Sequence, residues 1–157
     1  MLLTPHTIVG VAVATAISNP LIAAPLSFAL HFAGDKLPHW DFFSNTKNGE
    51  RRVGWRPLAV MADMSIGIFI ALTFTYYALW GLGDSYLALN IFLCGLASVL
   101  PDALTGPYIY TDNPPKFCMW IKNIQSKAQT QAPLPWGIFT QLVVVAVSVF
   151  LIWRSIL

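Results

Sequence analysis

Charged side chains are scarce in this chain. Of its 157 residues only 10% are charged and 56% are hydrophobic, and nine Lys and Arg against seven Asp and Glu leave a formal net charge of +2. Soluble domains usually carry about 25% charged residues. The composition therefore excludes an ordinary soluble domain, and so small a net charge gives no reason to expect nucleic acid as a partner. We expect an integral membrane protein in which residues 1–157 form a single membrane domain.

Cysteine is rare as well, and a cleavable leader is missing. Cys94 falls in an apolar run and Cys118 in a polar stretch, a spacing that excludes a disulfide framework and a cysteine-based zinc motif. We expect two reduced thiols. The first six residues carry no basic leader and no small-residue cleavage site follows, so the first segment is expected to remain in the mature protein.

Five apolar segments predict an all-α membrane bundle. Residues 5–18 and 20–36 meet at Asn19-Pro20, and at 1.5 Å per residue neither comfortably spans the roughly 30 Å of a bilayer core. These two segments predict a short N-terminal helical hairpin, with a re-entrant hairpin as one form. Three longer segments predict transmembrane helices at about 57–80, 85–101 and 134–155. Residues 37–56 and 103–133 are then polar loops, the second with room for an interfacial helix over 116–127.

Basic residues predict the orientation. Eight of the nine belong to the two polar loops or border them, and the hairpins put both loops on one side of the membrane: Lys36, Lys47, Arg51, Arg52, Arg56, Lys116, Lys122 and Lys127. The positive-inside rule makes that side cytoplasmic, and we expect the inner (plasma) membrane as the location. Trp40, Trp55, Trp120 and Trp136 fall near this boundary, and Trp80 and Trp153 fall near the other.

One stretch concentrates metal-binding side chains. His31 and Asp35 lie one helical turn apart at the end of the second apolar run, and Pro38 ends the helix. His39 and Asp41 then lie just past the helix end, close to the first pair. Imidazole nitrogens together with carboxylate oxygens suit zinc, manganese or iron.

Depth along the two hairpins brings further candidates to the same level. Folding back at Asn19-Pro20 places His6 level with residues 32–34, beside His31 and Asp35. The second hairpin turns between residues 82 and 83, which places Asp63 and Asp102 at equal depth. All three histidines and three carboxylates therefore gather at the cytoplasmic mouth of the bundle.

Such a gathering of carboxylates near lipid needs a partner. A buried carboxylate must be paired, protonated or bound to a cation, and few basic side chains are near enough to pair with all of them. We expect a divalent metal, with zinc first and manganese or iron as alternatives, bound by His6, His31, Asp35, His39 and Asp63. Each residue alone has a plainer interpretation: His6 as a helix-start residue at the interface, Asp63 as a protonated carboxyl between helices, Pro101-Asp102 as a helix-ending dipeptide.

The order of these motifs resembles a known family. His6 followed by Gly10, the run from His31 to Asp41, Asp63 early in a helix, and Gly95 before Pro101-Asp102 together resemble the small membrane-bound metal-dependent hydrolases. That family is distantly similar to zinc-dependent phospholipase C and P1 nuclease. The resemblance covers about residues 4–106. Family members often carry a further histidine before the last helix, and this chain has none there, which leaves room for one or two metals.

The resemblance implies metal-assisted hydrolysis of a phosphoester. The metal would acidify water and polarise the phosphoryl oxygen. Asp102 or Asp63 would act as general base, or as a further ligand. Arg51, Arg52 and Arg56 would hold the substrate phosphate, because guanidinium matches its oxygens. A site at the headgroup level of the cytoplasmic face suits a lipid or a lipid-linked phosphate.

Two other classes remain open from the sequence. A metal-binding membrane protein without catalysis would need the same ligands and no open coordination position. A small transporter would use Asp63 and Asp102 as carrier carboxylates and the broken first hairpin as a discontinuous element. The depth of Asp63 and Asp102 favours the hydrolase and the non-catalytic metal-binding protein over the transporter. Transporter sites lie near the midplane of the membrane, and these two residues do not.

Overall fold

The computed structural model describes residues 1–44 and 53–156, and every regular element in these two ranges is helical. This confirms the expected all-α class. Six α-helices and one π-helical turn follow in order: α1 (Leu3–Ala16), α2 (Pro20–Lys36), α3 (Arg56–Tyr76), η2 (Tyr77–Gly81), α4 (Ser85–Tyr110), α5 (Lys116–Ala128) and α6 (Trp136–Ile156).

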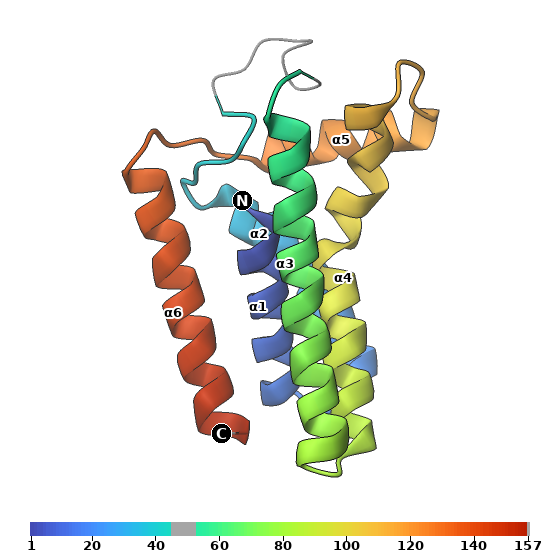
Figure 1. Cartoon of the computed structure of the whole chain (residues 1–157), viewed down its shortest axis with the longest axis vertical. Coiled ribbons are helices and arrows are strands. Elements are labelled where there is room, and N and C mark those ends of the chain that lie inside the picture. The colour runs from blue at the N-terminus through green and yellow to red at the C-terminus, as the bar shows by residue number, and fades with distance from the viewer. Residues whose placement is uncertain (45–52, 157) are drawn as a thin grey trace.

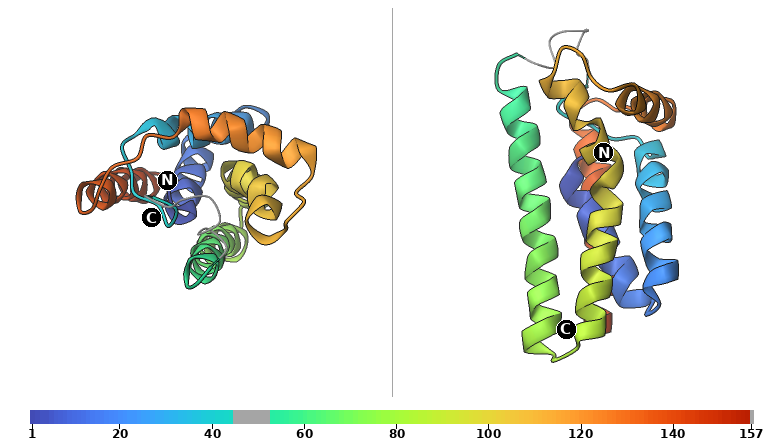
Figure 2. Two further views of the ribbon diagram at one scale, coloured as in Figure 1. Left: turned by 90° about the horizontal axis from the view of Figure 1, so that it is seen from above. Right: turned by 90° about the vertical axis from the view of Figure 1, so that its right-hand side faces the viewer.

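The helices are arranged around α1. α1 packs against α2, α3, α4 and α6, and α5 lies across one end of the bundle, where the chain begins (Figures 1 and 2). Three helices are long and apolar enough to cross a membrane: α3 continued by η2, α4, and α6. At 1.5 Å per residue, their 26, 26 and 21 residues reach about 39, 39 and 31 Å. α1 has only 14 residues, as expected for a short hairpin.

Two predicted boundaries are wrong. α4 does not end at residue 101 but continues through Pro101 and Pro107 to Tyr110, and much of the predicted loop 103–133 is therefore helical. Proline in a helix removes one hydrogen bond and disturbs the preceding turn. The bond that Pro101 cannot make would go to the Ala97 carbonyl; one residue further on, the Ser98 carbonyl accepts from the ring nitrogen Nδ1 of His31 on α2 at 2.8 Å. The helix considered for 116–127 is present as α5 (Lys116–Ala128).

Other helices supply the hydrogen bonds that the ends of α1 lack. At its start, Asp63 of α3 accepts from the backbone N–H of Leu3 at 2.6 Å and of Thr4 at 3.2 Å. At its end, the Asn90 amide of α4 donates to the Ala14 carbonyl at 2.9 Å and the Ile17 carbonyl at 2.7 Å. Helix ends need such partners when water is excluded. The contacts fix α1 along its axis.

Glycine allows α1 to approach its neighbours closely. A Cβ atom added at Gly10 would lie 2.7 Å from the Cys94 carbonyl and 2.8 Å from the Ser98 hydroxyl, both on α4. One added at Gly67 of α3 would lie 2.8 Å from the Thr7 hydroxyl. Only glycine fits these contacts without a shift of the helices. Gly10 lies one turn after His6, so this approach also positions His6.

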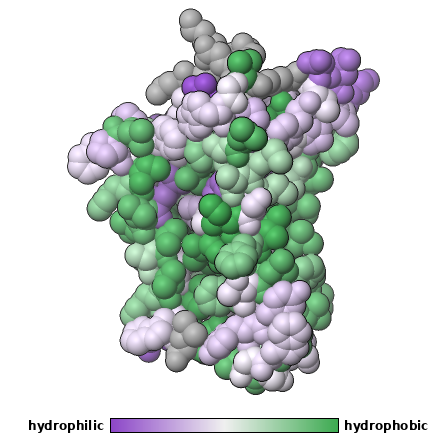
Figure 3. Space-filling model, in the orientation of Figure 1, coloured by the Kyte–Doolittle hydropathy of each residue, from purple (hydrophilic) through white to green (hydrophobic). Residues whose placement is uncertain are grey.

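The outer surface separates into apolar sides and more polar ends. Large hydrophobic side chains cover the sides, and hydrophilic residues gather at the two ends (Figure 3). Exposed Trp55 and Trp136 begin helices at the end where α5 lies, whereas exposed Trp80 and Trp153 lie near the opposite end. The predicted distribution of aromatic residues between the two ends is confirmed for these four. Cys94 and Cys118 are free, as expected, and both are buried.

Candidate metal centre

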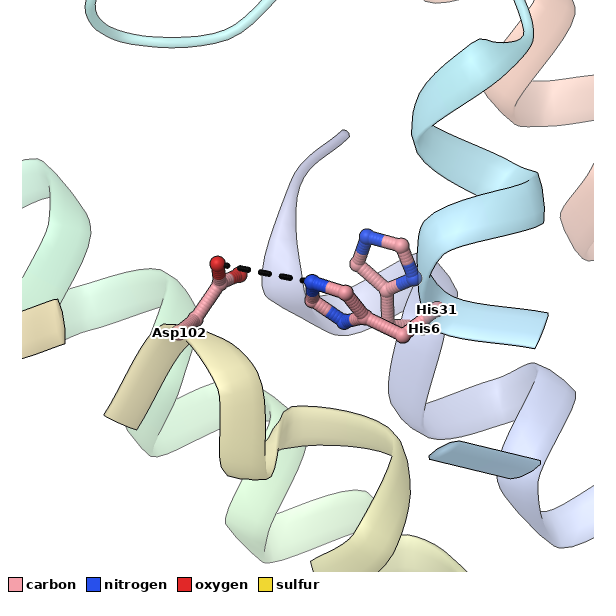
Figure 4. A group of neighbouring side chains, drawn as sticks. All are labelled: His6, His31 and Asp102. Atoms are coloured by element: carbon pink, nitrogen blue, oxygen red, sulfur yellow. Dashed lines mark ion pairs between the residues drawn. The ribbon is translucent and has the colours of Figure 1, made fainter. Parts of the chain in front are cut away.

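Three side chains from three helices converge near the α5 end of the bundle. His6 of α1, His31 of α2 and Asp102 of α4 each offer a ligand atom, and these atoms all lie within 4.8 Å of one another (Figure 4). The two imidazole rings stack with centroids 4.0 Å apart. His6 and His31 are each 1% exposed. The predicted meeting of the first hairpin with Asp102 is therefore found in the structure.

Asp35 adds a second carboxylate to this group. Its Oδ1 atom lies 3.1 Å from His6 Nε2 and also forms an ion pair with the α-amino group of Met1. Its Oδ2 atom lies 3.5 Å from His31 Nε2 and is buried without a hydrogen-bond partner among the described residues. A buried acceptor without a hydrogen-bond partner costs folding free energy unless a cation faces it.

The hydrogen bond to Ser98 fixes the tautomer of His31. A carbonyl oxygen only accepts, so His31 Nδ1 must carry a proton. In the neutral ring Nε2 is then a bare acceptor. It faces Asp35 Oδ2 at 3.5 Å and Asp102 Oδ1 at 3.6 Å. The Gln125 amide donates to two of these acceptors, His31 Nε2 and Asp102 Oδ1. Asp35 Oδ2 has no hydrogen-bond partner in the described ranges, and it repels the other two unless a metal ion, or a second proton on the ring, faces it.

Gln125 of α5 completes the wall of the group. Its Nε2 atom donates to Asp102 Oδ1 at 2.6 Å and lies 3.3 Å from His31 Nε2. The amide thus orients the carboxylate toward the imidazole. Gln125 is 5% exposed, which is low for a glutamine at the edge of a bundle.

His39 lies outside the three-residue group. Its Nδ1 atom donates to the Leu37 carbonyl at 2.8 Å, and its Nε2 atom lies 3.9 Å from Asp41 Oδ2 with no hydrogen-bond partner in the described ranges. Burial lowers the pKa of this imidazole below its ordinary value, so His39 is neutral at pH 7. Its backbone pairs instead with the segment before α6, through Thr130 and Ala132.

Asp63 lies at the predicted depth and has a different set of partners. Both carboxylate oxygens accept from the start of α1, including the Thr4 hydroxyl at 2.6 Å. Of the arginines predicted to hold phosphate, Arg56 donates to the Phe42 carbonyl at 3.1 Å and stacks on Trp55. Arg51 and Arg52 lie outside the described residues.

A cavity of about 610 Å³ adjoins the group. Asp102 and Gln125 both line it, and the Asp102 side chain is 28% exposed. His6, His31 and Asp35 are not among the residues that line it. Asp102 therefore connects the buried histidines to a space large enough for a small ligand.

Sequence reasoning did not identify Gln125 or the Ser98 carbonyl as parts of the site. A signal for Gln125 existed, because Cys118 and Gln125 are seven residues apart and share the buried face of α5. The Ser98 carbonyl gave no such signal.

The residues present suit a divalent metal. Two imidazoles and two carboxylates are the donor types that zinc prefers, and the buried, unpaired Asp35 Oδ2 marks where positive charge is needed. One ring nitrogen of His31 donates to a carbonyl, as is usual for a metal ligand, and the other, Nε2, faces the two carboxylates and the Gln125 amide.

Comparison with known proteins adds no assignment, since no family model, no curated protein and no solved structure matches the chain. Function is therefore inferred from the chemistry of the site.

Proposed function

We propose that this protein is a membrane-embedded, metal-dependent hydrolase of the small membrane-bound hydrolase type, which acts on a phosphoester of a lipid or lipid-linked substrate. One observation carries the proposal. Acceptor atoms of the buried His31 and Asp35 and of the partly exposed Asp102 lie close together, Asp35 Oδ2 has no hydrogen-bond partner among the described residues, and Asp102 also faces a cavity. This is the arrangement expected where a metal must meet a substrate.

His6, His31 and Asp35 would hold the metal beside Asp102, and zinc suits these donors. A bound divalent ion supplies Lewis acidity, which polarises a phosphoryl oxygen and acidifies water. Ser98 and Gln125 keep His31 and Asp102 in place through their hydrogen bonds. Such partners of ligands typically matter 10- to 100-fold for metal affinity or activity.

Asp102 is the candidate general base because it alone of these four side chains lines the cavity. In the reaction the oxygen of water bonds to phosphorus and the bond from phosphorus to the ester oxygen breaks. Asp102 takes one proton from the water and returns it to the leaving oxygen, which departs as an alcohol. Phosphate ester and water are thereby converted to a phosphate and an alcohol, with no other reactant.

The apolar sides of α3, α4 and α6 support insertion in a bilayer, with the site at the headgroup level. Lys36, Arg56, Lys116, Lys122 and Lys127 belong to the end that carries the site, and Arg154 lies near the other end of α6. By the positive-inside rule the site faces the cytoplasm, and the inner (plasma) membrane is the proposed location.

Metal-dependent turnover tests this proposal. Protein purified in maltoside detergent without chelator should hydrolyse bis(4-nitrophenyl) phosphate or phosphatidylglycerol vesicles. Chelation should abolish turnover, and zinc should restore it. His31→Ala should be inactive at any zinc concentration, whereas Asp84→Asn, at the far turn where Asp84 caps α4, should keep full activity.

Two outcomes would overturn the proposal. Turnover that survives complete chelation would separate the reaction from the metal. Absence of turnover with both substrates, from protein shown to carry metal, would leave a metal-binding protein without hydrolase activity.

A further inference from the structure

The cavity beside Asp102 has two chemically different sides. Val60 and Met64 of α3 and Val99 of α4 provide apolar surface, whereas α5 contributes Lys122 and Gln125. Met64 lines the cavity and is 39% exposed. The apolar side of the cavity is therefore not closed off by packing at Met64.

Lys122 is the one cationic side chain among the described residues that line this cavity. Its ammonium lies 3.8 Å from the centroid of the Tyr108 ring. Within the described ranges no carboxylate lies within ion-pair distance of it. A cation held on an aromatic face keeps its donors available to an anion.

The other cations of this end are not so placed. The guanidinium of Arg56 is bonded to the Phe42 carbonyl and stacked on Trp55, and it does not line the cavity. Lys116 and Lys127 are exposed on α5 and do not line it either. Among the cationic side chains that the structure describes, Lys122 is thus the one placed to meet an anion in the cavity beside Asp102.

We propose that the cavity binds a phosphorylated amphiphile, with its phosphate held by Lys122 beside Asp102 and its apolar chain against Val60, Met64 and Val99. The position of the phosphate rests on the proposed function, because the phosphate must reach the group that would hold the metal. The open side at Met64 gives the chain a route from the bilayer. This assigns to Lys122 a role that the sequence gave to Arg56, while Arg51 and Arg52 lie outside the described residues.

Binding of octyl phosphate by the protein in maltoside micelles tests the proposal, because these micelles contain no phosphate. Inorganic phosphate and octanol serve as the two halves of the ligand. We expect octyl phosphate to bind at least tenfold more tightly than either half in titration calorimetry. Equal affinity for inorganic phosphate would show that the chain is not recognised, and equal affinity for octanol would show that the phosphate is not; either result overturns the proposal.

Variants separate the two sides of the cavity. Lys122→Gln should weaken octyl phosphate binding at least tenfold, Lys122→Arg should restore most of it, and the matched variant Lys127→Gln should bind as the wild type does. Val99→Phe, which fills the apolar side, should reduce octyl phosphate affinity to that of inorganic phosphate. Unchanged binding by Lys122→Gln overturns the proposal.

The readouts also separate this proposal from the hydrolase itself. Lys122-dependent binding of octyl phosphate without turnover of any diester would refute the hydrolase and retain the ligand class. Turnover with a KM that Lys122→Gln leaves unchanged would retain the hydrolase and refute the role of Lys122.

Discussion

Asp63 and Asp102 are alike in sequence and different in the structure. Each is an aspartate at the same depth of a long apolar helix, and both line the same cavity. The backbone N–H groups of Leu3 and Thr4 occupy the Asp63 carboxylate, which therefore supports the start of α1. Asp102 instead meets the His31 ring and the Gln125 amide.

The difference shows what decides the role of a carboxylate in an apolar bundle. Depth brings it to the right level, but the acceptor capacity that neighbouring helices leave free determines whether it can meet a cation or a substrate. Asp63 is committed to backbone donors. Asp102, 28% exposed at the cavity, still has capacity for other partners.

The largest contrast should appear in turnover. Asp102→Asn removes the negative charge and the base while keeping the shape, and we expect turnover to fall about 100-fold or more. Asp63→Asn should change turnover less than about threefold, because its carboxylate does not face the histidines. Steady-state kcat for both variants measures this. An equal loss of kcat in the two variants would show that Asp63 takes part in the reaction as Asp102 does.

Stability should show the opposite contrast. Asp63→Ala leaves the buried N–H groups of Leu3 and Thr4 without partners, at a cost of about 3 kcal/mol. Asp102→Ala should cost clearly less, since its side chain is partly exposed. Thermal unfolding in detergent compares them, and a smaller loss for Asp63→Ala than for Asp102→Ala would contradict the capping role.

A smaller effect is expected where α1 meets α4. Gly10→Ala adds a carbon that would approach the Cys94 carbonyl to 2.7 Å, and this overpacking should cost about 1–2 kcal/mol and weaken metal binding through His6. Gly106 also lies on α4, but a Cβ atom added there would meet no atom within 4 Å. The variant Gly106→Ala should therefore lose neither stability nor metal. Unfolding temperature and metal content measured together test this, and wild-type values for Gly10→Ala would rule out the close approach.

Helical periodicity and hairpin depth predicted much of this site. They placed His6, His31, Asp35 and Asp102 together, because the depth of each residue can be counted from the turn of its hairpin, and both turns are visible in the sequence. They could not tell Asp63 from Asp102, since the difference lies in donors from α1 that have no sequence signature.

The misplaced parts of the site have physical causes too. His39 follows Pro38, outside any helix, and its position is set by pairing with residues 130–132, which lie about 90 positions along the chain. The end of α4 was predicted too early because proline usually ends a helix, whereas α4 continues through Pro101 and Pro107 to Tyr110.

Metal content is the most direct test of the central claim that His31 and its carboxylates form a cation site. Elemental analysis should compare wild type with two matched variants, His31→Gln and His39→Gln, all purified without chelator. We predict stoichiometric divalent metal in the wild type and in His39→Gln, and its loss in His31→Gln. A wild type without metal, or a His31→Gln variant that keeps it, would contradict the account.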